Sequence, residues 1–403
     1  QRVDHTGALL ESRVLEPAEP GKDLVLTLDP AVQRMAEDAL AGALRYVDSE
    51  RALRGLPSEA AVRGALVAMN TDSGEILAMA SAPSYDQNLF TRRPSDPERV
   101  AALLADPNLP MMNRAVEAYP PASTFKLVSS SALLESGFVA PEQRFGCPAG
   151  ISFGGRTWHN WATSDRGSYD ITGAIADSCN TYYWLAVLGT PEARRAGWSP
   201  FMAALEARAR ELGYAEPVGV GLLEEKAGRV PDEAWAEATY EYGWLPGMSL
   251  NVSIGQGDML ATPLQVLQLS AIIAESGRRV QPHLVKAVGD AETVPDVTVI
   301  PGAHWDSLQL GMRKMITDYG TNRLLGPASG FPVALAGKTG TAQNARGTGY
   351  DHVWFTGFAP YGDPELAWVL FIEHGDRSTA SAVPAVRDFL SEVYGVAEVG
   401  SAP

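Results

Sequence analysis

Cysteine is scarce in this sequence. Only Cys147 and Cys179 occur among 403 residues, too few for the disulfide framework of a small secreted protein. Neither lies in the paired Cys/His spacing that is typical of zinc, so we predict no metal site. We interpret both side chains as buried thiols rather than as ligands.

Long apolar runs and an excess of basic charge are also missing. No run approaches the roughly 18 residues that a membrane-spanning helix requires. The 32 basic and 48 acidic residues give a formal net charge of −16, which repels nucleic acid and anionic lipid, so we predict no nucleic-acid partner. The sequence begins at Gln1 without a start methionine, which leaves room for an upstream signal or anchor.

The N-terminal part alternates extended stretches with turns. Residues 7–15 read as a short strand, and residues 16–21 form a polar joint that contains proline. Asp29 and Pro30 are an N-cap and first-turn pair, which predicts a helix after them. With 45% hydrophobic residues, the chain is long enough for one large domain with an appendage or for two domains.

Strand patterns occur at both ends of the remaining chain, with helical patterns between them. The capping box Thr262-Pro263-Leu264-Gln265 predicts a helix that runs to Gly277. The predicted strands cover residues 65–69 and 76–80, which flank a turn, and residues 333–341, 352–358 and 367–373. These lengths predict an α+β fold, in which helices pack on an antiparallel sheet built from both ends of the domain.

The segment from Tyr119 to Val128 carries the first chemical signal. Pro120 and Pro121 end any preceding element, and a helix is predicted from about Ser123 to Gly137. Its only charge before Leu134 is Lys126, so this helix is expected to be buried and its lysine to enter the interior or the floor of a cleft.

A spacing of three residues places Ser123 and Lys126 on one face, with the serine at the positive end of the helix dipole. A desolvated lysine has a lowered pKa and can take a proton from a hydroxyl. For S-x-x-K alone, however, a serine N-cap followed by a lysine that reaches solvent is the more frequent explanation.

Two further motifs change that balance. Ser178-Cys179-Asn180 is a short polar insert between apolar runs, and Lys338-Thr339-Gly340 lies in a strand-like run where Gly340 lets a ligand backbone approach closely. The ordered triple of S-x-x-K, S-x-N and K-T-G is the signature of penicillin-binding proteins and class A β-lactamases. Together the three motifs favour a catalytic interpretation.

On these residues the sequence resembles the penicillin-binding proteins, and closely the class B group. The resemblance spans Val25 to Val393 and predicts the penicillin-binding transpeptidase fold, with an antiparallel sheet, a helical subdomain and a buried central helix that carries the nucleophile. Further matching stretches are Leu26 to Asp29, Asn113 to Ala115, Gly255 to Gly257, Ala261 to Pro263 and Gly337 to Gln343. Residues 353–360 and 178–183 are more similar to the cell-elongation subgroup than to the division subgroup.

The resemblance also implies roles at the site. Ser123 is the acylated nucleophile and Lys126 its base, while Ser178 relays a proton to the leaving amine. Asn180 holds Lys126 and the amide of the donor peptide. The remaining implied residues are Lys338 and Thr339, which bind the substrate carboxylate beside Gly340, and Thr341, whose N–H forms an oxyanion hole with that of Ser123. One departure is Ala122, where the family usually has glycine, although the same stretch also looks like the class D β-lactamase version.

The implied activity is peptidoglycan D,D-transpeptidation. Peptidoglycan stem peptides are the substrates, β-lactam antibiotics the inhibitors, and a SEDS-type membrane glycosyltransferase the partner; no cofactor is implied. Residues 1–22 resemble the end of an N-terminal pedestal, residues 23–396 the transpeptidase domain and residues 397–403 a tail. The implied location is the outer face of the bacterial cell membrane, with an anchoring N-terminal helix that this chain does not include.

Other functions remain open at this point. A β-lactamase or D,D-carboxypeptidase shares the acylation step, but the chain has no Glu-x-x-Leu-Asn segment to supply a deacylating carboxylate. A β-lactam sensor uses the same motifs, whereas a scaffold without activity is disfavoured by the intact site residues. His159 lies between the first two motifs, and we interpret it as part of an aromatic loop rather than as a base.

Overall fold

A computed structural model describes residues 2–6, 8–11, 20–56, 63–94, 96–189, 199–319, 321–344, 347 and 349–396. The chain divides into two compact units. The smaller comprises residues 1–26 and 285–294 and contains two small antiparallel sheets. Their strands are β1 (Arg2–Val3) with β2 (Leu9–Glu11), and β12 (Ala291–Glu292), β11 (Val285–Val288) and β3 (Leu24–Leu26). The strand predicted at 7–15 is observed at Leu9–Glu11, and its last four residues lie outside the described ones.

The larger unit is built on a five-stranded antiparallel sheet in the order β14-β15-β16-β4-β5. Its strands are β4 (Gly64–Asn70), β5 (Ile76–Ala82), β14 (Ala336–Ala342), β15 (His352–Ala359) and β16 (Leu366–Ile372). All five predicted strands are therefore confirmed. The central strand β16 is buried along its whole length, which explains its continuous apolar run.

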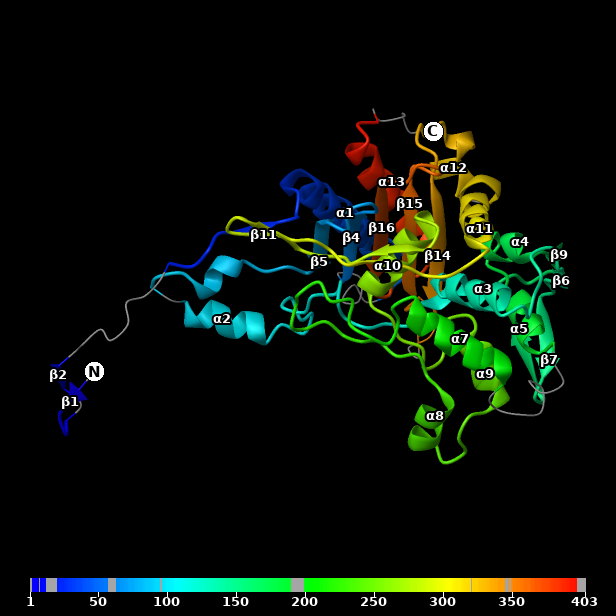
Figure 1. The fold of residues 1–403 in the computed structure, drawn as a ribbon, viewed down its shortest axis with the longest axis horizontal. Helices are drawn as coiled ribbons and strands as arrows, with labels where there is room; N and C mark the ends of the chain where they lie inside the picture. Colours follow the sequence, from blue (N-terminus) through cyan, green and yellow to red (C-terminus); the bar gives the residue numbers. More distant parts are fainter. Residues whose placement is uncertain are drawn as a thin grey trace. The chain divides into compact units, whose positions relative to one another are not determined.

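Alternate residues of the strands face two separate cores. Leu66 and Ala68 of β4 pack in a cluster with α1 (Pro30–Leu53) and α13 (Ser378–Val393), which lie together on one face of the sheet (Figure 1). Val67 of β4 lies in the other cluster with α10 (Pro263–Ala274). This two-residue period is what a sheet covered on both faces requires.

The predicted helix starts are confirmed by their caps. The Asp29 carboxylate accepts hydrogen bonds from the N–H groups of Ala31 and Val32 at the start of α1. Thr262 and Gln265 form the reciprocal capping box of α10. This helix ends at Ala274 rather than at Gly277, because a tight turn precedes β10 (Arg278–Val280).

A helical region lies beside the sheet and contains most of the remaining elements (Figure 1). Its central helix α3 (Lys126–Glu135) has nine consecutive buried residues, as predicted. Among the described residues, the other helices of the larger unit are α2 (Pro97–Leu104), α4 (Ile171–Ala176), α5 (Asn180–Val187), α7 (Pro200–Glu211), α8 (Glu233–Thr239), α9 (Pro246–Val252), α11 (Trp305–Asp318) and α12 (Asn322–Leu325). Short 3₁₀ turns are η2 (Gln87–Phe90), η3 (Ala122–Thr124) and η4 (Pro327–Ser329), and small strands are β6 (Phe145–Gly146), β7 (Gly150–Phe153), β8 (Arg156–His159), β9 (Ser168–Tyr169) and β13 (Val297–Val299). In the part of the chain that is described, no helix has the length and apolarity to span a bilayer.

Candidate active site

Ser123 lies in the 3₁₀ turn η3, immediately before α3, rather than in the first turn of an α-helix as predicted. The reason is Ala122, whose φ of 51° is in the left-handed region that costs an L residue about 1–2 kcal/mol. The Ala122 N–H donates to the Gly255 carbonyl at 2.9 Å. Gly255 itself has a φ of 72°, and a Cβ there would lie 2.2 Å from the Ala122 oxygen. The turn is therefore held by close backbone contact at Gly255, and alanine occupies the strained position where the family usually has glycine.

Lys126 is the first residue of α3 and is fully buried. Its ammonium donates to the Ser178 carbonyl at 2.6 Å, the Ser178 hydroxyl at 3.2 Å and the Asn180 side-chain oxygen at 2.6 Å. Burial lowers the pKa of Lys126 well below its ordinary value, the charge of Lys338 lowers it further, and Asp177 opposes both effects. The lysine therefore loses its proton more readily than an ordinary, solvent-exposed lysine.

Ser178 and Asn180 lie where α4 ends and α5 begins. Ser178 has a φ of 55°, another left-handed conformation outside glycine. Its hydroxyl lies 3.2 Å from the Lys126 nitrogen and 3.0 Å from the Lys338 nitrogen. This single hydroxyl thus connects the two buried lysines.

The K-T-G motif lies on β14, at the edge of the five-stranded sheet. Lys338 is fully buried and also donates to the Thr339 carbonyl at 2.9 Å. Burial lowers the pKa of Lys338 to about 7 against the opposing effect of Asp177. A Cβ at Gly340 would lie 3.2 Å from the Pro121 oxygen, so this glycine lets the strand approach the turn that carries Ser123. That Gly340 also admits a ligand backbone stays a prediction.

The structure therefore brings Ser123, Lys126, Ser178, Asn180 and Lys338 into one region, with Thr339, half-buried, and Thr341, exposed, on the adjoining strand. Among the described residues, no hydrogen bond joins the Ser123 hydroxyl to a partner. Such bonds are often long in the absence of substrate. His159 is exposed at the end of β8 and forms no hydrogen bond with these residues in the described part of the chain.

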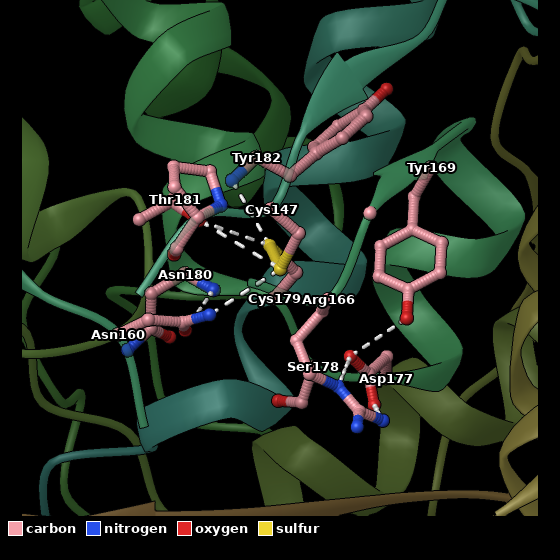
Figure 2. The surroundings of a disulfide bond; sticks show 12 residues. Cys147, Asn160, Arg166, Tyr169, Asp177, Ser178, Cys179, Asn180, Thr181 and Tyr182 are labelled. Carbon is pink, nitrogen blue, oxygen red and sulfur yellow. Dashed lines mark hydrogen bonds and ion pairs between the residues drawn. A yellow bond between two sulfur atoms is a disulfide. The ribbon is translucent and has the colours of Figure 1, made fainter. Parts of the chain in front are cut away.

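Sequence reasoning missed Asp177, which is buried beside the site. Its carboxylate accepts two hydrogen bonds from Arg166, at 2.8 and 2.9 Å, and one from the Tyr169 hydroxyl at 3.0 Å (Figure 2). Its negative charge raises the pKa values of Lys126 and Lys338. Its position next to Ser178 was a signal that could have identified it.

The prediction of two free thiols was wrong. Cys147 and Cys179 are both buried, but they form a disulfide bond (Figure 2). A single pair of cysteines, distant in sequence, gives no spacing from which such a bond is read; only the fold brings them together. No group of three or more potential metal ligands occurs among the residues that the structure describes.

Comparison with known proteins agrees with this geometry. Residues 64–391 match the penicillin binding protein transpeptidase domain. The peptidoglycan D,D-transpeptidase MrdA of Haemophilus influenzae is 29% identical over 410 residues, which cover 96% of this chain and 58% of that protein. The chain thus spans less than two thirds of that relative.

Two solved structures extend the likeness. A chain from a peptidoglycan synthase complex, studied for coordination of polymerization and crosslinking, is 43% identical with a TM-score of 0.88, and the match covers 99% of this chain and 67% of that one. Penicillin-binding protein A from M. tuberculosis, as an imipenem acyl-enzyme complex, is 26% identical with a TM-score of 0.73, covering 93% and 80%. This chain therefore belongs to the penicillin-binding protein transpeptidase family, within the class B cell-elongation subgroup that the sequence predicted.

Proposed function

We propose that this chain is a peptidoglycan D,D-transpeptidase with Ser123 as its nucleophile. The observation that carries the proposal is the Ser178 hydroxyl, which lies within hydrogen-bond distance of both Lys126 and Lys338. It connects all three motifs in one proton-transfer network, and both of its lysine partners have lowered pKa values. The relatives named as transpeptidases and the imipenem acyl-enzyme support the same chemistry.

In the proposed acylation step, neutral Lys126 takes the proton of Ser123 as the serine oxygen bonds to the carbonyl carbon of a D-Ala-D-Ala unit. The backbone N–H groups of Ser123 and Thr341 stabilise the oxyanion. Lys126 returns that proton through the Ser178 hydroxyl to the departing nitrogen, the C–N bond breaks and D-alanine leaves. An acceptor stem-peptide amine then attacks the acyl-serine and forms the new amide bond; the proton that the amine loses passes through Lys126 to the Ser123 oxygen as the ester bond breaks.

Lys338 and Thr339 are proposed to bind the terminal carboxylate of the donor. Lys338→Ala should therefore reduce acylation by penicillins, which carry a carboxylate, by about ten-fold or more, because a charge-assisted hydrogen bond is lost. A neutral acylating agent should be affected less. Acylation rates for both agents would measure this difference, and equal losses would show that Lys338 acts through structure or general electrostatics. Thr317→Ala, on α11, is a control outside the site.

A hydrolase is the main alternative, and the lifetime of the acyl-enzyme separates the two. A positioned base that activates water contributes typically about 10²–10⁴-fold in rate. The motifs supply Lys126 as the base for acylation, but they include no carboxylate segment that would activate water for hydrolysis of the acyl-enzyme. The penicillin adduct should therefore last for many minutes. Intact mass spectrometry after removal of free drug measures this lifetime. Disappearance of the adduct within seconds, with release of hydrolysed penicillin, would establish a β-lactamase or carboxypeptidase instead.

A β-lactam sensor would form the same stable adduct but release no D-alanine from a stem peptide.

The wider context is proposed from the resemblance. A SEDS-type glycosyltransferase is the proposed partner, and the peptidoglycan synthase complex supports an assembly of that kind. The proposed location is the outer face of the cell membrane. Residues 1–22 are proposed as the end of a pedestal and residues 23–396 as the transpeptidase domain. The predicted tail, 397–403, lies outside the described residues.

A further inference from the structure

The disulfide lies inside the S-x-N motif. Cys179 is the residue between Ser178 and Asn180, and its partner Cys147 follows β6. Both cysteines are fully buried. The Cys179 sulfur also accepts a hydrogen bond from the Tyr182 N–H at 3.3 Å, so it caps the start of α5. A covalent bond therefore joins the S-x-N motif to the segment that follows β6.

Asn160 provides a second connection between the same two segments. Its side-chain oxygen accepts from the Asn180 N–H at 3.1 Å, and its amide nitrogen donates to the Cys147 sulfur at 3.3 Å (Figure 2). The Thr181 hydroxyl adds a third, because it donates to the Pro148 carbonyl at 3.1 Å. Each of the three residues that follow Ser178 is thus fastened to residues 147–160.

The residue before Ser178 is held from the same side. The Asp177 carboxylate is paired with Arg166, and its carbonyl accepts from the indole N–H of Trp161 at 3.0 Å. Ser178 lies between these two sets of attachments in its left-handed conformation. Such a conformation costs free energy and persists only where the surroundings determine it. Here the surroundings are residues 147–169, which we call the bracing segment.

We propose that the Cys147–Cys179 disulfide and Asn160 are positioning elements for acylation, which hold Ser178 and Asn180 against Lys126. This inference rests on the proposed transpeptidase function. The oxidised protein acylates rapidly, and the dithiol form acylates slowly, because its motif keeps only hydrogen bonds to the bracing segment and is held less firmly against the lysine. Oxidation by a small disulfide such as oxidised glutathione converts two thiols into the protein disulfide and yields two reduced glutathione molecules, so electrons and protons balance.

The inference predicts which kinetic constant changes. Displacement of reacting groups by about 1 Å can cost roughly 10²-fold in rate, so the acylation constant k2 should fall about ten- to a hundred-fold in the dithiol form. The carboxylate site on β14 is built on the five-stranded sheet, outside the bracing segment. The dissociation constant Ks of the non-covalent penicillin complex should therefore change less than k2. A loss of folded protein would instead reduce the labelled fraction.

The test uses time courses of labelling by a fluorescent penicillin at several concentrations. Oxidised wild type is compared with wild type kept reduced during purification, with the reductant removed anaerobically before the drug is added. Thiol content is verified by alkylation and mass. Cys147→Ser and Asn160→Ala should show the same fall in k2. Re-oxidation should restore the k2 of the reduced wild type to that of the oxidised protein, whereas the k2 of Cys147→Ser should stay low.

Leu390→Ala is the control for stability, because Leu390 is buried in α13 in the other core cluster. Leu390→Ala should keep a normal k2 at a temperature where the melting curves show that this variant, Cys147→Ser and Asn160→Ala are all folded. Equal k2 values for oxidised and reduced wild type would overturn the inference, as would an equal fall in Leu390→Ala. If Cys147→Ser does not fold, the reduced and re-oxidised wild type decide. Oxidised wild type that fails to label at Ser123 would overturn the proposed function itself.

Discussion

Ser123→Ala should abolish covalent labelling by a fluorescent penicillin while leaving the melting temperature nearly unchanged. Ser123 is half-buried in η3, one turn from Lys126, and its side chain makes no hydrogen bond within the described residues, so its loss removes little packing. Nucleophilic attack requires an oxygen at this position. Labelling on gels and intact mass after penicillin treatment would measure the result.

The matched control is Ser136→Ala, which removes a hydroxyl from an exposed position at the end of α3. This variant should label at the normal rate. A penicillin adduct that persists on Ser123→Ala would show that another residue is acylated, and peptide mapping would then locate it.

Lys126→Arg should lower the rate of acylation by about 10²–10⁴-fold, the usual contribution of a general base. The lysine must be neutral to accept the serine proton, and the neutral form is populated above its pKa. Because burial lowers that pKa, acylation by the wild type should increase as pH rises through a value well below that of an ordinary lysine. Arginine does not lose its proton in this range, so the variant should lack this increase.

Labelling rates as a function of pH would measure both effects, and a melting curve would show that the variant is folded. Lys314→Arg makes the same chemical change on α11, where the lysine donates to the Thr172 hydroxyl at 2.8 Å, and should label normally. A near-normal rate and pH profile for Lys126→Arg would mean that a different group accepts the serine proton.

Features encoded by neighbouring residues could be predicted from the sequence. The Asp29 cap and the Thr262 capping box are local, and the structure contains both. The apolar surroundings of Lys126 predicted a buried helix, because a lone charge cannot change the character of such a run. The order of the three motifs predicted the family, although no single motif did.

Features made by contacts between distant segments could not be predicted. The disulfide joins Cys147 to Cys179 only because the fold places a loop behind the S-x-N motif. The role of Asn160 depends on the same contact. The 3₁₀ turn at Ser123 follows from the backbone of Gly255, far along the chain, which receives the N–H of a strained Ala122. Local propensity contains none of this information.

The order of strands in the sheet has a consequence for how the chain acquires its structure during synthesis. Residues 64–70 of β4 pair with residues 366–372 of β16, so the hairpin of β4 and β5 is synthesised well before its partner strand. Pairing across such a distance in sequence slows folding. Until β16 is present, the hairpin of β4 and β5 exposes the apolar edge of β4, which promotes aggregation. A nascent chain that has not yet reached residue 366 therefore has no complete sheet, and β14 (Ala336–Ala342) is not yet held in it through β15 and β16. The region around Ser123 and Lys338 can therefore be completed only after β16 has been synthesised.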